Sequence, residues 1–231
     1  MIDFRGSLGG FCRWLSRKPI SISKMPKLFS IDHSNPPADL IEHSAQILAS
    51  GGIVVFPTET FYGIAADTQS PDGLMKLAKL KDREAEKPFP LIVSSVSQLD
   101  SLVSEISTFV QKIMDFYWPG PLTLVMEAKP GVHPKLLSNN NGIGVRLSPW
   151  PIAQALAKAL DRAITATSAN LAGHPPVSRV ADLDPAVAEA VDLVLDGGAT
   201  PGGLASTVLD VRTDPPRVLR QGPIQIPGAV Q

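Results

Sequence analysis

The chain has 231 residues, which suits one large α/β domain or two small ones, and its 44% content of hydrophobic residues can bury a substantial core. Charged residues make up 19% of the chain and are evenly mixed, which argues against disorder. The formal net charge of −1 argues against a dedicated nucleic-acid coat protein or a polybasic membrane binder.

The cysteine and histidine content argues against disulfides and protein-built metal sites. Cys12 is the only cysteine, so one chain can form neither a disulfide nor a thiolate metal site, which fits a reducing compartment. The four histidines show no metal-ligand spacing, and no apolar run approaches the roughly 20 residues that span a bilayer. We therefore expect a cytoplasmic protein with no protein-built metal site and no membrane partner.

The first 24 residues differ in composition from the rest. They carry several serines and five cations against the single acid Asp3, a weak transit-peptide composition. A mistaken upstream start codon or a loose tail explains them as well. We expect 1–24 to be an extension, disordered or outside the core, whose removal leaves a cooperative melt. We expect 27–224 to form one domain and 225–231 a tail. The cations are Arg5, Arg13, Arg17, Lys18 and Lys24.

Helical and strand patterns alternate along the chain. The first helix is predicted over 38–50, where apolar residues recur with helical spacing and Gly51-Gly52 provides a stop. The alternation predicts an α/β fold, a single-domain open twisted mixed sheet flanked by helices, with antiparallel closing strands. The other predicted elements are, in order, a strand 53–56, a helix 71–80, a strand 89–93, helices 96–103 and 106–117, strands 122–126 and 144–147, a helix 151–160, and strands 164–167, 191–195, 207–211 and 218–220.

A polar cluster follows the apolar strand 53–56. Thr58, Glu59, Thr60 and Tyr62 come almost directly after its last residue. In an α/β sheet the carboxyl ends of strands face the ligand crevice, so hydroxyl groups placed there are well sited for binding. The alternative is that both threonines only satisfy backbone groups at a turn.

Cations follow the helix predicted over 71–80. Lys81, Arg83 and Lys87 can hold a phosphate chain if they turn inward together. The run of alternating charges around them also fits a solvated helix end. If the clamp exists, we expect alanine at Lys81 or Arg83 to lower the reaction rate about 10²–10³-fold and to leave folding nearly untouched.

Hydroxyl, amide and cationic side chains recur at other strand ends. Ser168 and Asn170 follow a buried-looking strand, and Ser178 lies in the loop beyond. Ser206 precedes the strand 207–211, and Arg220 lies at a strand exit. One such strand end is ordinary turn chemistry, but a set of them suggests a common crevice lined for an anion.

The familiar phosphate-binding and nucleophile signatures are missing. There is no Gly-x-x-x-x-Gly-Lys-Ser/Thr loop and no Gly-x-Gly-x-x-Gly after a strand. Gly142-x-Gly144 is followed by strand-like residues and is typical of a turn, and no Gly-x-Ser-x-Gly elbow occurs. The residues alone therefore lead to an anion-binding α/β domain.

Seven ordered motifs resemble those of the YrdC-domain family, and the resemblance covers about residues 27–224. The motifs are Pro57-Thr58-Glu59-Thr60-Phe61-Tyr62-Gly63, Lys81-x-Arg83 with Lys87-Pro88, Trp118-Pro119-Gly120-Pro121-Leu122-Thr123-Leu124, Val145-Arg146, Ser168-Ala169-Asn170-Leu171-x-Gly173, Ser206-Thr207-Val208 and Arg220-Gln221-Gly222.

The resemblance implies a YrdC-like fold and an activity. Members with these motifs join L-threonine, bicarbonate and ATP into threonylcarbamoyl-AMP and release pyrophosphate. A separate transferase complex then modifies the tRNA adenosine beside the anticodon. By resemblance, ATP is a substrate, Mg²⁺ is expected to bridge its phosphates, and RNA binding is a further possibility.

The resemblance also implies roles for individual residues, each carried over by its motif. Threonine would be bound by Thr58, Arg146 and Ser206. The catalytic cations would be Lys81 and Arg83. ATP would be held by Lys81, Arg83, Ser168, Asn170, Ser178 and Arg220.

Three positions depart from the family pattern. Glu84 replaces a frequent proline, Ser94 a frequent histidine and Ala205 the usual glutamate, and the longer members' C-terminal domain has no counterpart. These departures leave open an RNA-binding or regulatory paralogue without synthase activity, or a nucleotide-binding module without turnover. The slightly negative charge and the lack of an aromatic stacking platform argue against RNA binding.

Overall fold

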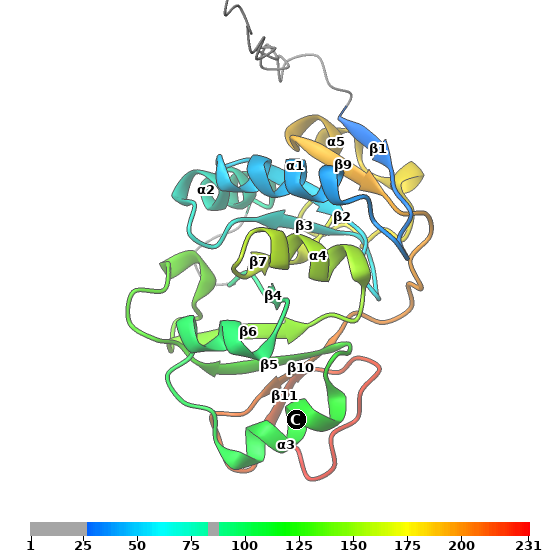
Figure 1. Ribbon diagram of the computed structural model, residues 1–231. Helices are drawn as coiled ribbons and strands as arrows, with labels where there is room; N and C mark the ends of the chain where they lie inside the picture. Colours follow the sequence, from blue (N-terminus) through cyan, green and yellow to red (C-terminus); the bar gives the residue numbers. More distant parts are fainter. Residues whose placement is uncertain (1–26, 83–87) are drawn as a thin grey trace, which may run out of the picture.

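The computed structural model describes residues 27–82 and 88–231 (Figure 1). The predicted extension 1–24 and the predicted cation Arg83 lie outside these ranges.

The described strands form two mixed sheets (Figure 1). The predicted α/β class with open mixed strand pairing is confirmed. The strands are divided between two sheets, where one was predicted. In the first sheet β9 pairs in parallel with β1 and β2, and β3 pairs antiparallel with β2 and β8. Its order is β1 (Leu28–Ser30), β9 (Leu193–Asp196), β2 (Ile53–Phe56), β3 (Gly63–Ala66) and β8 (Thr167–Ser168).

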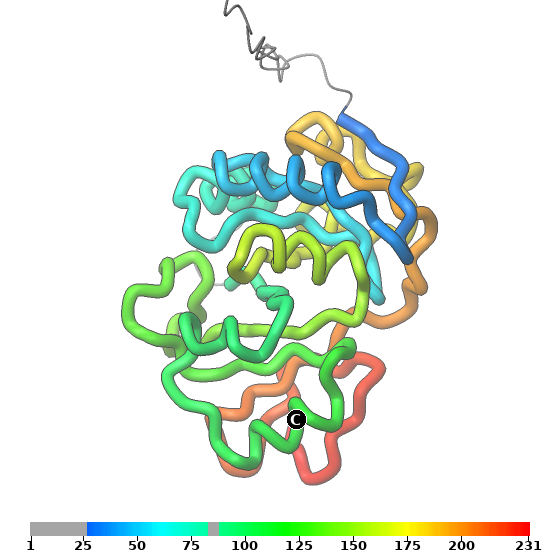
Figure 2. The backbone as a smooth tube through the Cα atoms, in the orientation of Figure 1, coloured from blue at the N-terminus to red at the C-terminus, as the bar shows by residue number. Residues whose placement is uncertain are grey.

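In the second sheet, segments distant in sequence lie side by side. The green β5 and the orange β10 are parallel neighbours although a large part of the chain separates them (Figure 2). The predicted antiparallel pairing of the closing strands β10 and β11 is confirmed. The order is β11 (Arg217–Arg220), β10 (Thr207–Asp210), β5 (Leu122–Glu127), β6 (Gly142–Leu147), β4 (Leu91–Val93) and β7 (Ile164–Thr165).

The strand predicted over 164–167 is divided between the two sheets. Its first half, β7, pairs with β4 in the second sheet, and β8 pairs with β3 in the first. At the crossing, the Ala66 N–H donates to Thr165 Oγ1 at 2.8 Å, and Thr165 Oγ1 donates to the Ile64 carbonyl oxygen at 3.1 Å. A buried hydroxyl thus satisfies backbone groups that lose their ladder partner where the chain changes sheet.

Helices cover the sheets, and their ends follow local sequence signals. Helix α1 ends just before Ser50-Gly51, and the φ of Gly51 is +80°. Helix α2 begins after Ser70, whose Oγ accepts from the Gly73 N–H at 3.2 Å. The segment predicted as a helix over 96–103 is a 3₁₀ helix. The helices are α1 (Ala38–Ala49), α2 (Pro71–Leu80), η2 (Val96–Ser101), α3 (Thr108–Tyr117), η3 (Pro134–Leu136), α4 (Pro151–Ala159), η4 (Val180–Asp182) and α5 (Pro185–Ala190).

The β2 strand is buried on both faces, which explains its continuous apolar run. Ile53 and Val55 join the larger core cluster, which reaches the second sheet. Val54 and Phe56 face the cluster under α1 and α4. Because side chains alternate along a strand, β2 is clamped between two cores, and the loop that follows it starts from a fixed point.

Five described elements were not predicted, namely β1, β3, α5 and the two three-residue 3₁₀ helices η3 and η4, and each is short or has a weak local signal. The β3 sequence Gly-Ile-Ala-Ala has low strand propensity, β1 has three residues, and α5 has six. Gly142 and Gly144, interpreted as a turn, lie within β6. Residues 225–231, predicted as a tail, return along β11, where the Val218 N–H donates to the Val230 carbonyl oxygen at 2.7 Å.

Candidate active site

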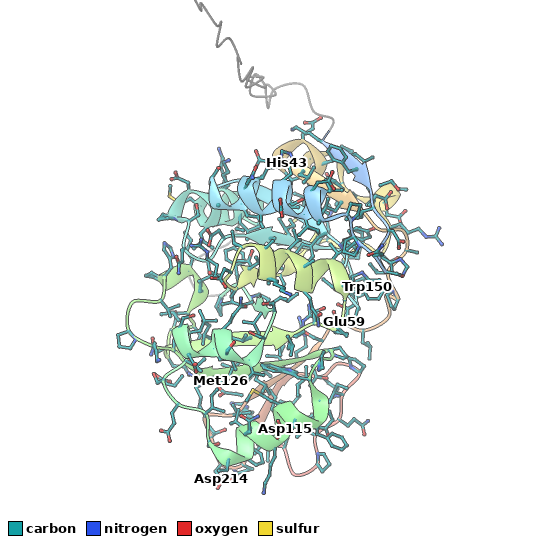
Figure 3. The ribbon with its side chains drawn as sticks, viewed as in Figure 1. His43, Glu59, Asp115, Met126, Trp150 and Asp214 are labelled. Atoms are coloured by element: carbon teal, nitrogen blue, oxygen red, sulfur yellow. The ribbon has the colours of Figure 1, made fainter. Side chains whose placement is uncertain are left out.

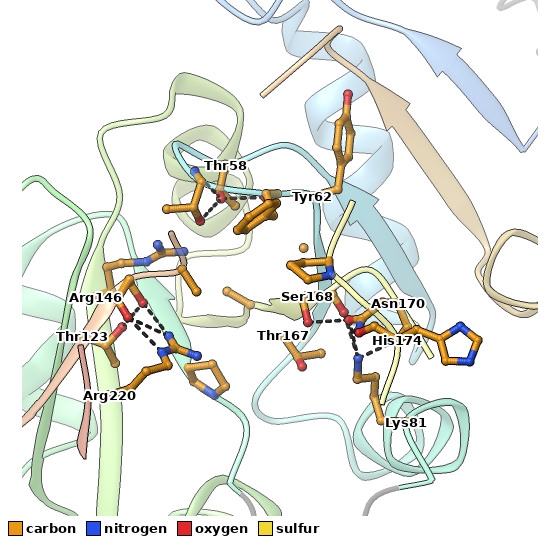
Figure 4. Close-up of a pocket in the computed structure, with 18 of the residues that line it drawn as sticks. Thr58, Tyr62, Lys81, Thr123, Arg146, Thr167, Ser168, Asn170, His174 and Arg220 are labelled. Atoms are coloured by element: carbon orange, nitrogen blue, oxygen red, sulfur yellow. Dashed lines mark hydrogen bonds between the residues drawn. The ribbon is translucent and has the colours of Figure 1, made fainter. Parts of the chain in front are cut away.

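A cavity of about 620 Å³ lies between the two sheets. Figure 4 shows Arg146 and Arg220 on one side of it and Lys81, Ser168 and Asn170 on the other. The first wall comes from β5, β6, β11 and the approach to β10. The second comes from the loop after β2, the end of α2 and the segment around β8. Seven of the residues with predicted roles line this cavity: Thr58, Lys81, Arg146, Ser168, Asn170, Ser206 and Arg220.

The loop after β2 is held by its own hydroxyl groups and by a neighbouring loop. Thr58 Oγ1 donates to the Phe61 carbonyl oxygen at 2.7 Å and accepts from the Thr60 N–H at 3.2 Å. The Thr60 carbonyl oxygen accepts from the Gly202 N–H at 2.8 Å and from Thr200 Oγ1 at 2.9 Å. The threonines therefore do satisfy backbone groups at a turn, and that turn forms part of the cavity wall.

Tyr62 anchors the end of this loop. Its hydroxyl donates to the Gly198 carbonyl oxygen at 2.6 Å, lies 3.2 Å from Asp196 Oδ1 and accepts from the Gly197 N–H at 3.2 Å. Burial, with the charge of Asp196 as a second cause, raises the pKa of Tyr62 well above its ordinary value. The phenol is thus a neutral structural donor.

Arg146 reaches the cavity from β6 and forms an ion pair with Glu59, which is not among the described residues that line the cavity. Its Nη1 donates to Glu59 Oε1 at 2.5 Å, and Ser148 Oγ donates to Glu59 Oε2 at 2.5 Å. The Arg146 and Glu59 side chains are only 7% and 8% exposed. Burial lowers the pKa of the Arg146 guanidinium and the Glu59 carboxylate opposes that shift, so the group stays cationic.

Arg220 contacts Ser206 at the same wall. Arg220 Nε and Nη2 donate to the Ser206 carbonyl oxygen at 3.0 and 2.8 Å, and Nη2 also donates to Ser206 Oγ at 3.0 Å. Ser206 Oγ lies 3.0 Å from Thr123 Oγ1 on β5. Partial burial lowers the pKa of Arg220, and the charge of Arg146 lowers it further. Two cations whose fields overlap make this wall attractive to an anion.

Lys81 follows the last residue of α2 and points into the opposite wall. Its Nζ donates to the carbonyl oxygens of Ser168 and Asn170 at 3.0 and 2.6 Å and to Asn170 Oδ1 at 2.9 Å. Ser168 Oγ also donates to Asn170 Oδ1, at 2.5 Å, and Asn170 Nδ2 donates to the His174 carbonyl oxygen. Lys81 is 7% exposed, so it is a buried cation that organises the loop after β8, and the solvated-helix-end alternative does not describe it.

Two other residues with predicted roles are not among the described residues of the cavity wall. Ser178 is not among the described residues that line the cavity. Its carbonyl oxygen accepts from the Thr200 N–H at 2.9 Å and so supports the wall. Arg83 lies outside the described ranges. Thr123 lines the cavity and had no predicted role, although it belongs to the Trp118–Leu124 motif, and that motif was the signal that could have found it.

The described residues offer no protein-built metal cage. Within 27–82 and 88–231, no group of three or more histidine, cysteine, aspartate or glutamate side chains could hold a metal ion. In the same ranges no helix is long and apolar enough to cross a membrane.

Known proteins are similar to this chain over most of its length. The family model described as "Telomere recombination" (Sua5, YciO, YrdC) matches residues 46–222. The chain is 33% identical over 189 residues to the threonylcarbamoyl-AMP synthase of Bacillus subtilis, covering 80% of this chain and 54% of that protein. It is 32% identical to the protein of that name from Photobacterium profundum, covering 80% of this chain and 100% of that protein.

A solved structure is similar to most of this fold. The structure of Pyrococcus abyssi Sua5 complexed with L-threonine matches with a TM-score of 0.78 at 31% identity, covering 84% of this chain and 57% of that one. The chain thus spans about half the length of the Bacillus and Pyrococcus relatives and the full length of the Photobacterium relative.

Proposed function

Because the chain belongs to the Sua5/YciO/YrdC family, we propose that it is a threonylcarbamoyl-AMP synthase, a nucleotidyltransferase that joins L-threonine, bicarbonate and ATP. One observation carries the proposal: a single cavity between the two sheets has buried cations and hydroxyl groups on both of its walls. Such a cavity can accept two anionic substrates side by side. The Photobacterium relative, which this chain matches over its whole length, has the same name.

Arg146 and Ser206 on the first wall form the proposed threonine site, and Thr58 contributes to it from the loop after β2 on the second wall. A planar guanidinium can bind a carboxylate through two N–H groups, and buried hydroxyls nearby can pair with the hydroxyl and amino groups of the substrate. The threonine complex of Pyrococcus abyssi Sua5 supports an amino-acid site in this fold.

The opposite wall is the proposed ATP site, with Lys81, Ser168 and Asn170, and Arg220 reaches it from the threonine side. Arg83 and Ser178 belong to the same proposal by their motifs. Lys81 and Arg220 would lie at the two ends of the phosphate chain. A cation fixed by hydrogen bonds before the substrate arrives needs no reorganisation when charge develops.

The proposed reaction has two bond-forming steps. The amino group of threonine combines with bicarbonate to give a carbamate and water. A carbamate oxygen then attacks the α-phosphorus of ATP, the bond from that phosphorus to the oxygen bridging to the β-phosphate breaks, and pyrophosphate leaves. The two walls hold the reactants in contact, and Lys81, Arg83 and Arg220 stabilise the charge on the leaving pyrophosphate. Magnesium would arrive with the phosphates, because the described residues do not form a cage for it.

The same proposal includes partners and location. Threonylcarbamoyl-AMP is a reactive mixed anhydride, so a transferase complex that modifies tRNA adenosine would consume it. Both proteins would act in the cytoplasm, and contact with RNA would occur through that handover.

The test is formation of pyrophosphate by the full chain when threonine, bicarbonate and ATP are supplied together, with each omitted in turn and the product identified by mass. Lys81→Ala should reduce the rate about 10²–10³-fold, the typical loss for one preorganised electrostatic contact. Lys79→Ala, an exposed cation on the same helix, is the matched control. Wild-type protein without threonine-dependent pyrophosphate would overturn the proposal, and tight RNA binding by that protein would support the paralogue.

A further inference from the structure

Glu59 joins the two sheets at the edge of the cavity. It lies in the loop after β2, and its two carboxylate oxygens accept from Arg146 Nη1 and Ser148 Oγ, both at 2.5 Å, at the end of β6 in the other sheet. The buried guanidinium and hydroxyl thus engage both oxygens. Figure 3 shows Glu59 between the two halves of the molecule, below Trp150.

The two donors face the same way because they are two residues apart. Side chains at positions i and i+2 of an extended chain lie on one face, so Arg146 and Ser148 form a fork that receives one carboxylate. Ser148 is fully buried and accepts from the Trp150 N–H at 3.2 Å, which orients its own hydroxyl proton toward Glu59.

The other end of the link is fixed as firmly. Glu59 lies between Thr58, whose hydroxyl is bonded within the turn, and Thr60, whose carbonyl oxygen accepts from Gly202 and Thr200. The carboxylate therefore has little freedom to leave its two donors.

Glu59 acts on the cavity through Arg146. Among the described residues, Arg146 lines the cavity, whereas Glu59 and Ser148 do not. The guanidinium donates to Glu59 through Nη1. The guanidinium has five N–H donors in a planar fork, so fixing Nη1 from behind sets the plane and leaves donors for a ligand on the cavity side.

We propose that Glu59 is a positioning residue for the amino-acid substrate: with Ser148 it orients the Arg146 guanidinium to receive the substrate carboxylate. This inference rests on the proposed function, since it names the residue that orients Arg146 in the proposed threonine site. The charge of Glu59 also offsets the cost of burying Arg146 beside Arg220. The substrate carboxylate can then bind while Arg146 keeps its position.

The opposite role for Glu59 predicts the opposite result. A carboxylate on Arg146 could occupy the place of the substrate carboxylate and have to be displaced. Removing its charge would then tighten threonine binding. The second bond to Ser148 and the fixed loop favour a held carboxylate over a displaced one.

The experiment compares Glu59→Gln with wild-type protein in two assays: calorimetric affinity for L-threonine, and KM for threonine and for ATP. Glutamine keeps the shape and removes the charge. We expect the Kd and KM for threonine to rise about tenfold or more, because a charge-assisted contact and the orientation it sets are lost, while KM for ATP changes less than about threefold. Glu127→Gln, an exposed carboxylate that pairs with Arg212 away from the cavity, is the matched control and should change neither.

Ser148→Ala provides a second variant in case Glu59→Gln folds poorly. It removes one of the two bonds to Glu59 and leaves the ion pair, so a smaller rise in threonine Kd is expected, in the same direction. Unchanged or tighter threonine binding in these variants, or equal effects on both substrates, overturns the inference while the proposed function stands. Wild-type protein that binds no threonine overturns the proposed function and this inference together.

Discussion

Arg220 donates three hydrogen bonds to Ser206, two to its carbonyl oxygen and one to its hydroxyl. Arg220 was expected at the nucleotide and Ser206 at the amino acid, so the two proposed subsites touch. Because Arg220 can only donate, Ser206 Oγ accepts from it and keeps its own proton for another acceptor. A ligand that pairs with Ser206 therefore feels the charge of Arg220.

Ser206→Ala should consequently affect both substrates. The change removes one acceptor of Arg220 and the partner of Thr123 Oγ1, and it leaves the carbonyl contacts intact. We expect KM for threonine and for ATP each to rise about 2–10-fold, the usual effect of one hydrogen bond. Initial rates with one substrate varied at a time measure this, with Ser104→Ala, which is bonded to Ala128 outside the cavity, as the control. An effect confined to one substrate would separate the subsites.

Arg146→Lys should raise the KM for threonine more than the KM for ATP. Lysine keeps the charge, but its single ammonium cannot bond Glu59 behind it and present a planar pair of donors in front. About a tenfold or larger rise for threonine is expected from the loss of bidentate geometry. Arg212→Lys, a paired arginine away from the cavity, serves as the comparison. Equal changes in the two KM values would count against the assignment of Arg146.

Lys81→Ala should reduce stability as well as activity. The sequence suggested that folding would be nearly untouched, but Lys81 Nζ is buried against three oxygens of Ser168 and Asn170. Acceptors left without a partner cost roughly 1–3 kcal/mol. Urea unfolding should show a loss of about 2–3 kcal/mol for Lys81→Ala and less than about 0.5 kcal/mol for the exposed Lys79→Ala. If both variants unfold like wild type, Lys81 does not hold the loop after β8.

Acidification should weaken the fold partly through His133. Its Nδ1 accepts from the Lys135 N–H at 3.2 Å, which only an unprotonated nitrogen can do. Burial and the charge of Lys135 lower the pKa of His133 below 6.5. A lowered pKa in the folded state means that this contribution is present above the ordinary pKa and is lost as the pH falls through the folded-state pKa.

His133→Asn tests that contribution, because asparagine can accept the same N–H and does not titrate. At about pH 7.5 the variant should unfold at the same urea concentration as wild type. Between about pH 7.5 and pH 5 its free energy of unfolding should fall less than that of wild type. An identical decrease in both proteins would show that His133 does not contribute to the acid sensitivity.

Elements with a strong local signal were predicted closely. The helix over 71–80 coincides with α2, because Ser70, Pro71 and the apolar spacing are all local signals. The short β3 strand was missed, because Gly63 and its alanines have no strand preference, and pairing with β2 decides their conformation. The change of sheet at Ala166 could not be predicted, because it depends on the Ala66 and Ile64 backbone groups that Thr165 satisfies from about a hundred positions away along the chain.

The sequence by itself determined which side chains stand at the ends of buried strands, since apolar runs and the polar residues that interrupt them are properties of neighbouring positions. Only the tertiary structure decided their partners. Arg146 pairs with Glu59 across 87 positions, and Lys81 pairs with Asn170 across 89. The first pair joins the two sheets, and the second joins the end of α2 to the loop after β8. The charge of a lysine or arginine does not decide whether it is solvated or buried, because that depends on which oxygens the fold places around it.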